Sequence, residues 1–142
     1  MSQPVGTITP FHDSHQVGLD IADRSVVKPI PKGAVAKWTV QNVDGEKNYY
    51  RLYVSDGQKD YALRASEDGT SVYAHESSPR SLDSHVWLIP QLEGKFFGIL
   101  DPATIRAWKV NGTTIELVEP PVAEDDALDA FKFKFSFGDF EY

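Results

Sequence analysis

One pattern constrains this chain more than any other: a strand-like segment centred on an aromatic residue recurs at a nearly constant interval. Trp38 is followed after 49 residues by Trp87, and after a further 46 residues by Phe133. Each of the first two segments is followed by a charged turn containing glycine and then by a second aromatic strand. A period of this length is typical of repeated supersecondary units that share one core. The sequence therefore predicts three such units.

Strand-like runs account for most of the chain, because stretches rich in Val, Ile, Thr and aromatic residues alternate with Gly, Asp, Asn, Ser and Pro. Twelve strands in three units of four predict an all-β fold with little or no helix. This number and grouping of strands is that of a β-trefoil, in which three hairpins cap a six-stranded barrel. An irregular β-sandwich is the alternative, and it would not require the period. The expected strands are 5–9, 16–21, 26–30, 36–41, 48–54, 60–64, 71–75, 85–90, 95–100, 106–110, 114–118 and 131–137.

Local signals refine this prediction. The pairs Asn111-Gly112 and Asp68-Gly69 stand between strand-like runs and predict tight hairpins. The best helical candidate is one turn within 123–131. Trp38 and Trp87 hold equivalent places in the repeat and are expected in the core. Trp108 departs from the pattern and is expected to be partly exposed.

Length and composition exclude several classes of protein. A chain of 142 residues predicts a single domain spanning 1–142. The absence of cysteine excludes disulfides and thiolate nucleophiles, and a net charge of −7 argues against nucleic acid as a partner. No apolar run reaches the roughly 18–20 residues of a membrane span, and no secretory signal is visible. We therefore expect a cytoplasmic monomer that binds neither nucleic acid nor a membrane.

Catalytic and metal-binding patterns lack support in the sequence. His12 and His15 have an HxxH spacing, but no third ligand is placed by sequence, so no metal or other cofactor is expected. Serine, histidine and aspartate occur without a G-x-S-x-G elbow or a glycine-rich phosphate loop. The acidic pair Asp125-Asp126 lies in a charged stretch typical of a solvated loop. The chain is not expected to be an enzyme.

Two connections each place an arginine directly before a serine. They are Asp23-Arg24-Ser25-Val26, before the third expected strand, and Pro79-Arg80-Ser81, before the eighth. A trypsin-type serine protease recognises an extended segment whose arginine or lysine enters a pocket ending in a carboxylate. A loop held rigid by its scaffold binds with little ordering cost. Spacing alone ranks the two loops equally and is also compatible with ordinary solvated charges.

One stretch carries a family resemblance. Val17 to Asp20, Ala22 to Pro29 and Lys37 to Val40 resemble the mushroom β-trefoil serine protease inhibitors of the cospin and cnispin type. The segment Val86 to Ile89 and the Phe-rich last strand fit the same family more loosely. Two features depart from the family pattern: Ala22 stands where an acidic residue is expected, and the first strand lacks the usual aromatic.

The resemblance implies inhibition of a trypsin-like serine protease through one exposed basic residue. In the family, this residue lies between the second and third strands or between the eleventh and twelfth. The second of these connections, 119–129, contains neither lysine nor arginine here. The resemblance therefore favours Arg24 as the specificity-pocket residue, with Ser25 beyond the scissile bond, Ala22 and Asp23 on the non-primed side and Val26 on the primed side. The segment Pro79, Arg80 and Ser81 is the secondary candidate.

Two other functions are compatible with the predicted fold. A carbohydrate-binding trefoil would use Trp108, although the Gln-x-Trp motif of ricin-type lectins is absent at all three tryptophans. A cysteine-protease inhibitor on the same fold would need a wedge loop of small residues rather than a basic loop.

Overall fold

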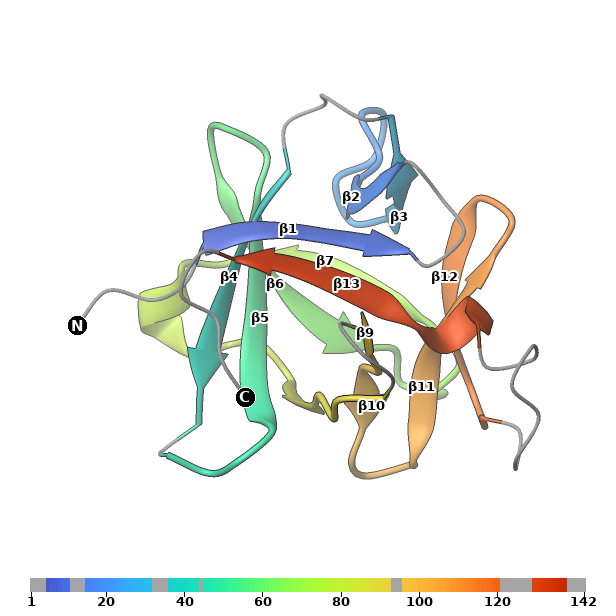
Figure 1. Ribbon diagram of the computed structural model, residues 1–142. Coiled ribbons are helices and arrows are strands. Elements are labelled where there is room, and N and C mark those ends of the chain that lie inside the picture. Colours follow the sequence, from blue (N-terminus) through green and yellow to red (C-terminus); the bar gives the residue numbers. More distant parts are fainter. Residues whose placement is uncertain are drawn as a thin grey trace.

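The computed structural model describes residues 5–10, 15–31, 36–43, 45–92, 96–120 and 129–137. In these residues the chain forms strands joined by short connections, with two single turns of 3₁₀ helix (Figure 1). The strands are β1 (Val5–Pro10), β2 (Gln16–Leu19), β3 (Val27–Ile30), β4 (Lys37–Asn42), β5 (Tyr49–Ser55), β6 (Asp60–Ala65), β7 (Val72–Glu76), β8 (Val86–Leu88), β9 (Phe96–Phe97), β10 (Leu100–Asp101), β11 (Arg106–Asn111), β12 (Thr114–Val118) and β13 (Phe133–Phe137); the 3₁₀ turns are η1 (Pro79–Ser81) and η2 (Asp129–Phe131).

The strands form a barrel with three hairpins, as the repeat predicted. Antiparallel pairing runs through β10, β8, β5, β4, β1, β13 and β9 in that order. Only two residues separate β9 from β10, so the two ends of this series meet and the sheet closes on itself. The hairpins β2–β3, β6–β7 and β11–β12 complete the three units. Closure pairs the barrel strands of the described residues on both sides, which strands this short could not otherwise achieve.

One predicted strand is divided in two, which raises the number of strands from twelve to thirteen in the described residues. The expected run 95–100 breaks at Gly98 and Ile99. The Gly98 N–H donates to the carbonyl of Pro90, and the Ile99 carbonyl accepts from the N–H of Trp108. As a result, β9 pairs with β13 whereas β10 pairs with β8 and β11. Because of this break, the segment pairs with β13 at its start and with β8 and β11 at its end.

The two predicted hairpins are present, with one change of register. Gly69 has a φ of 72° in the loop between β6 and β7, a conformation that glycine adopts without strain. Between β11 and β12, Asn111 pairs directly with Thr114, so the turn consists of Gly112 and Thr113. The expected Asn-Gly centre is therefore wrong by one residue. Gly112, with a φ of 62°, takes the first turn position and Asn111 stays in the strand.

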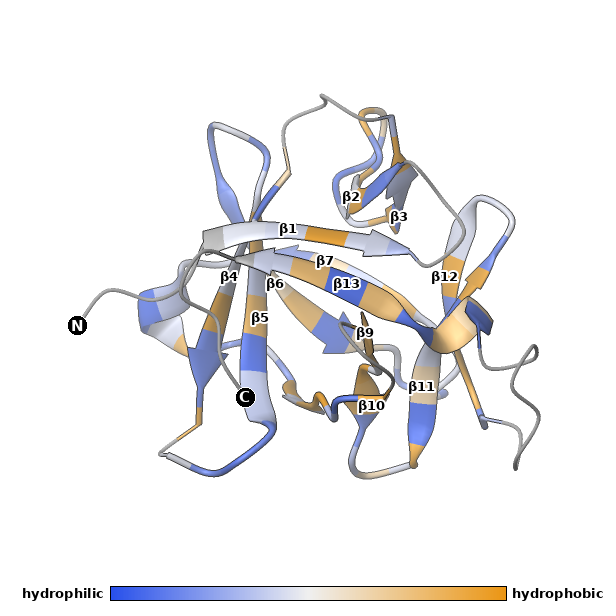
Figure 2. Ribbon diagram, in the orientation of Figure 1, coloured by the Kyte–Doolittle hydropathy of each residue, from blue (hydrophilic) through white to orange (hydrophobic). Residues whose placement is uncertain are grey.

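The predicted helical turn is found in part. Of the expected stretch 123–131, residues 129–131 form η2, and residues 123–128 lie outside the described part of the chain. The last strand, β13, alternates hydrophobic and hydrophilic residues along its length (Figure 2). Its Phe133 is fully buried, whereas Lys134 is exposed.

The centre of the core is a cluster of four aromatic side chains. Trp108 lies 6.1 Å from Trp38, 5.5 Å from Trp87 and 6.0 Å from Phe133, measured between ring centroids. All four side chains have an exposed fraction of 0%. Trp38 and Trp87 are in the core as predicted. The expectation that Trp108 is partly exposed is wrong, because this side chain fills the space where the last strands of the three units converge.

Hydrogen bonds of the other two tryptophans show which residues correspond to Trp108 in their units. The Trp38 indole N–H donates to the carbonyl of Val17 at 2.7 Å, and the Trp87 indole N–H donates to that of Leu63 at 3.3 Å. Val17 and Leu63 thus correspond to Trp108 in the third unit, where Phe133 stands in place of tryptophan. In the first two units, tryptophan stands on the last strand and a smaller, aliphatic residue on the hairpin. In the third unit, the tryptophan stands on the hairpin and the smaller residue, Phe133, on the last strand.

We expect Trp108→Ala to lower the free energy of unfolding by about 3–5 kcal/mol, because it leaves a cavity against three aromatic rings. Urea unfolding followed by far-ultraviolet circular dichroism measures the change. Leu92→Ala removes a side chain that is 43% exposed and serves as the control, with an expected change below about 1 kcal/mol. Equal losses in the two variants would contradict the central role of Trp108.

Candidate functional site

The predicted binding loop is the connection from β2 to β3, residues 20–26. Its base is closed by the Asp20 N–H, which donates to the Val26 carbonyl at 3.0 Å. Inside this base, the Val26 N–H donates to the Asp23 carbonyl at 3.0 Å. Arg24 and Ser25 are therefore the two central residues of a β-turn. The Arg24–Ser25 peptide is at the tip of a closed loop and is folded rather than extended.

Asp23 stabilises this turn through its side chain. Its Oδ1 accepts from the Ser25 N–H at 3.0 Å and from the Ser25 hydroxyl at 2.7 Å. These two hydrogen bonds hold the pKa of the Asp23 carboxyl below its ordinary value of 3.8. Asp23 and Ser25 are exposed, so the turn is fixed by local hydrogen bonds and not by burial.

The same contact between an aspartate and a hydroxyl residue occurs in the second unit, although the turn there is closed by the Gly69 N–H, which donates to the Ser66 carbonyl at 2.9 Å. Asp68 Oδ1 accepts from the Thr70 N–H at 3.1 Å and from the Thr70 hydroxyl at 2.8 Å, and together with Ser66 these contacts lower the pKa of Asp68 to about 2. Asp68, Gly69 and Thr70 thus correspond to Asp23, Arg24 and Ser25. The acidic and hydroxyl residues are features of the scaffold, and the residue between them is arginine in one unit and glycine in the other.

Backbone contacts fix the far side of the loop. The Ala74 N–H donates to the Ser25 carbonyl at 2.9 Å, and Val26 forms an antiparallel bridge with Tyr73. The Ser25–Val26 segment is therefore attached to β7 of the next unit. On the other side of Arg24, Ile21 and Ala22 are exposed, with Ile21 at 86%. The non-primed side of the predicted scissile bond is thus open to a partner, and the primed side is anchored.

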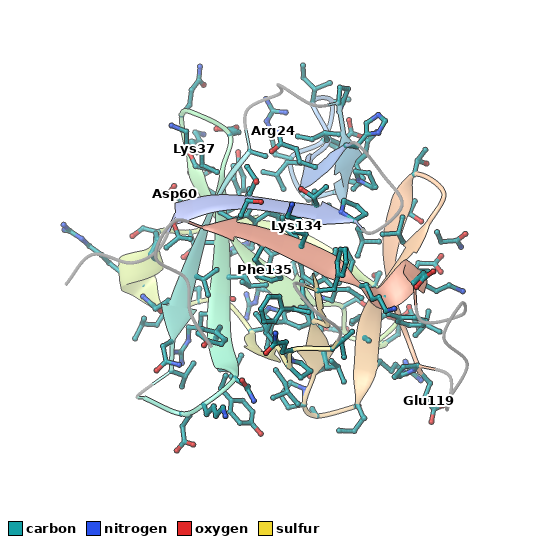
Figure 3. The ribbon with its side chains drawn as sticks, viewed as in Figure 1. Arg24, Lys37, Asp60, Glu119, Lys134 and Phe135 are labelled. Atoms are coloured by element: carbon teal, nitrogen blue, oxygen red, sulfur yellow. The ribbon has the colours of Figure 1, made fainter. Side chains whose placement is uncertain are left out.

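Arg24 folds back toward the protein (Figure 3). Its Nε donates to Asp56 Oδ2 at 2.9 Å, and its Nη1 donates to the carbonyl of Asp20 at 3.0 Å. The guanidinium-bearing side chain remains 38% exposed. Asp56 belongs to the turn between β5 and β6, where the N–H groups of Lys59 and Gln58 donate to Oδ1 and, with Arg24, lower the pKa of Asp56.

A pocket of about 480 Å³ lies beside the loop. Its charged groups balance each other, because Arg24 pairs with Asp56 and Lys28 lies 3.8 Å from Asp20. Among the described residues, its remaining walls are aliphatic and no aromatic side chain lines it. The lining residues are Leu19, Asp20, Ile21, Arg24, Lys28, Ile30, Pro31 and Asp56.

The secondary candidate lies elsewhere on the molecule. Pro79, Arg80 and Ser81 form η1, at the left edge of Figure 1, whereas β2 and β3 lie at its upper right. Arg80 and Ser81 are exposed and Pro79 is half-buried. The structure does not bring the two Arg-Ser loops together.

Two side-chain pairs could not be predicted from the sequence because their members are distant in the chain. One is Arg24–Asp56, and the other joins His85 Nε2 to Asp101 Oδ1 at 2.9 Å. Burial raises the pKa of Asp101, but hydrogen bonds from His85, Ala103 and Thr104 bring it below its ordinary value. The hydroxyl of Ser84 donates to the carbonyls of Leu63 and His85 and not to the His85 ring.

In the described part of the chain, no three His, Cys, Asp or Glu residues are grouped so that they could hold a metal ion. His12 and the pair Asp125-Asp126 fall outside the described residues.

No protein-family model matches the sequence, and no curated protein matches it. Solved structures match it over nearly its whole length. SeviL bound to asialo-GM1 saccharide is 12% identical, with a TM-score of 0.66, and the match covers 96% of this chain and 99% of that chain. The designed three-fold symmetric protein ThreeFoil is 13% identical, with a TM-score of 0.67 and coverages of 92% and 96%.

A third match is a Culex salivary protein of the cysteine and tryptophan-rich family. It is 14% identical, with a TM-score of 0.65 and coverages of 94% and 93%. At these identities the likeness concerns the fold alone, and it agrees with the closed barrel and the three hairpins. The chain is a β-trefoil protein. No helix among the described residues is long and apolar enough to cross a membrane.

We expect the 20–26 turn to open in acid. The pKa of Asp23 is lower in the folded chain than in the unfolded chain, so its stabilising effect is complete above about pH 4 and is lost as the pH falls through the lowered pKa. Amide hydrogen exchange at Ser25, compared between about pH 5 and pH 2 after correction for intrinsic rates, measures this loss. Asp23→Ala should remove the protection at both pH values. Unchanged protection in that variant would contradict the role of Asp23.

Proposed function

We propose that this β-trefoil protein inhibits trypsin-like serine proteases by binding the active site of the enzyme through the 20–26 loop. Arg24 would enter the specificity pocket, with Ser25 beyond the scissile bond. The observation that carries this proposal is an Arg-Ser peptide bond at the tip of a loop that is closed at its base and attached to β7 through the Ser25 carbonyl. A segment anchored in this way binds with little ordering cost, and after cleavage its ends remain close enough for religation.

The sequence supports the same assignment. The resemblance to the cospin and cnispin type is most specific over 17–40, which includes the whole loop. Asp23 and Ser25 have counterparts of the same chemistry in the second unit, Asp68 and Thr70, whereas the counterpart of Arg24 is Gly69. The contact between aspartate and hydroxyl therefore does not require an arginine between them. A position that this local contact leaves unconstrained is a suitable place for a specificity determinant.

Binding would require two local changes. The Arg24 guanidinium must exchange Asp56 for the carboxylate of the protease pocket, and the turn closed by the Val26 N–H must extend. The ion pair to Asp56 is partly exposed, and pairs of this kind contribute about 0–1 kcal/mol. A contact of about 1,600 Å², usual for a protease and its inhibitor, provides ample compensation.

The decisive experiment is trypsin inhibition in a chain that lacks the other Arg-Ser loop. We expect Arg80→Ala to inhibit trypsin, and the double variant Arg24→Ala/Arg80→Ala to lose inhibition by at least about 100-fold, because the pocket carboxylate is left unpaired. Arg80→Ala/Lys37→Ala removes an exposed cation at the start of β4 and should inhibit like Arg80→Ala (Figure 3). Equal inhibition with and without Arg24 would overturn the proposal.

Asp56→Asn tests the retracted position of Arg24. The variant keeps Oδ1, which accepts from Gln58 and Lys59, and removes the charge that holds the guanidinium. We expect the inhibition constant for trypsin to decrease by no more than about fivefold, the equivalent of a partly exposed ion pair. A weaker inhibitor would mean that Asp56 presents Arg24 to the enzyme instead of retaining it.

Carbohydrate binding is a second candidate, favoured by the fold match to SeviL bound to a saccharide. Trp108 cannot stack on a sugar because it is fully buried. A sugar would bind in the pocket beside the loop, since Asp20, Asp56 and Lys28 offer hydrogen bonds and its aliphatic walls can contact C–H groups. Glycan-array binding that disappears in Lys28→Ala, in a protein without effect on trypsin, would favour this function. Papain inhibition that survives Arg24→Ala would instead favour a cysteine-protease inhibitor.

A further inference from the structure

The connection from β7 to β8, residues 77–84, is a compact loop closed by side chains. The Ser77 hydroxyl donates to Asp83 Oδ2 at 2.7 Å and joins the two ends of the loop. Gln41 of β4 donates to the Pro79 carbonyl at 3.3 Å. Ser84, which is buried, accepts from the Leu52 N–H at 3.1 Å. The loop is therefore attached to the barrel at its end and near its middle.

The tip of this loop is also ordered. The Ser78 hydroxyl accepts from the Arg80 N–H at 3.0 Å, and the Ser78 carbonyl accepts from the Ser81 N–H at 3.0 Å. These bonds form η1, with Pro79 in its first turn. The Arg80 side chain is exposed and makes no hydrogen bond or ion pair within the described residues. Its guanidinium is thus free, in contrast to that of Arg24.

Leu82 adds an apolar side chain in a costly conformation. Its φ is 56° and its ψ is 35°, in the left-handed region that favours glycine, and it is 52% exposed. A bulky residue at positive φ is an outlier, and such outliers are enriched at functional sites. Ile105 is likewise exposed, with a φ of 59°, so the conformation alone does not distinguish Leu82. Leu82 differs in its place, because it ends η1 two residues after the exposed Arg80.

We propose that the 77–84 loop is a second binding site for a trypsin-like serine protease, with Arg80 in the specificity pocket and Leu82 against the enzyme surface beside it. Guanidinium and carboxylate pair through two parallel hydrogen bonds, which is the geometry that such a pocket offers. Like Arg24–Ser25, the Arg80–Ser81 bond lies in a single turn at the tip of a closed loop. Since η1 and the 20–26 loop lie on different sides of the barrel, one chain binds two enzymes at once (Figure 1).

This second site extends the proposed function and does not depend on it. The test uses trypsin whose nucleophilic serine is replaced by alanine, so that it binds without cleaving. Isothermal titration calorimetry and light scattering after gel filtration give the number of enzymes per chain. We expect two for the parent, one each for Arg24→Ala and Arg80→Ala, and none for the double variant.

The outcomes separate the two proposals. One enzyme per parent chain, unchanged by Arg80→Ala and lost in Arg24→Ala, overturns the second site and leaves the first. One enzyme per parent chain, lost in Arg80→Ala and unchanged by Arg24→Ala, supports the second site and overturns the first. Binding that persists in the double variant overturns both.

Leu82 is tested separately in the Arg24→Ala chain. Leu82→Gly removes the apolar side chain and the strain together, so we expect an unfolding midpoint that is unchanged or higher and an affinity for the inactive trypsin about tenfold lower. Leu82→Met keeps an apolar side chain and should bind like its parent. A lower unfolding midpoint with unchanged affinity would assign Leu82 to the fold and overturn its role in binding.

Discussion

The packing of Trp108 against Trp38, Trp87 and Phe133 is the interaction on which the rest of the structure depends. β4, β8 and β13 each bring one aromatic side chain to the centre of the barrel, and Trp108 contacts all three at centroid distances of 5.5–6.1 Å. Interiors are packed as densely as organic crystals, so the four side chains that meet at this centre must fit one another closely. The third unit contributes to this fit by combining phenylalanine on its last strand with tryptophan on its hairpin.

The barrel in turn determines what its loops can do. In the first two units, an aspartate two residues before a serine or threonine accepts from the backbone N–H and the hydroxyl of that residue, although the backbone turns differ. The intervening position is Arg24 in one unit and Gly69 in the other. A scaffold that fixes the turn with conserved chemistry, and leaves one side chain open, can acquire a binding function by changing that side chain alone.

Much of the fold could be predicted from the sequence because its signals are local. The aromatic interval, the alternation of apolar and polar residues and the Gly-containing turns led to the β-trefoil and to strands within a few residues of those observed. The errors have a common origin in contacts between distant segments. The split at Gly98 arises because β9 and β10 pair with different strands, and the burial of Trp108 arises because the last strands of all three units meet there.

The candidate site divides in the same way. The chain by itself determined that two arginines precede serines in short connections between strands, since turn residues and strand periods are written in consecutive positions. Only the tertiary structure decided that these arginines differ in their partners and in their exposure. Closure of the barrel brings Asp56 within 2.9 Å of Arg24 across 32 residues of sequence, whereas Arg80 is left exposed on a loop held by Gln41. Electrostatic partners of this kind depend on which segments the fold places side by side, and no local pattern specifies them.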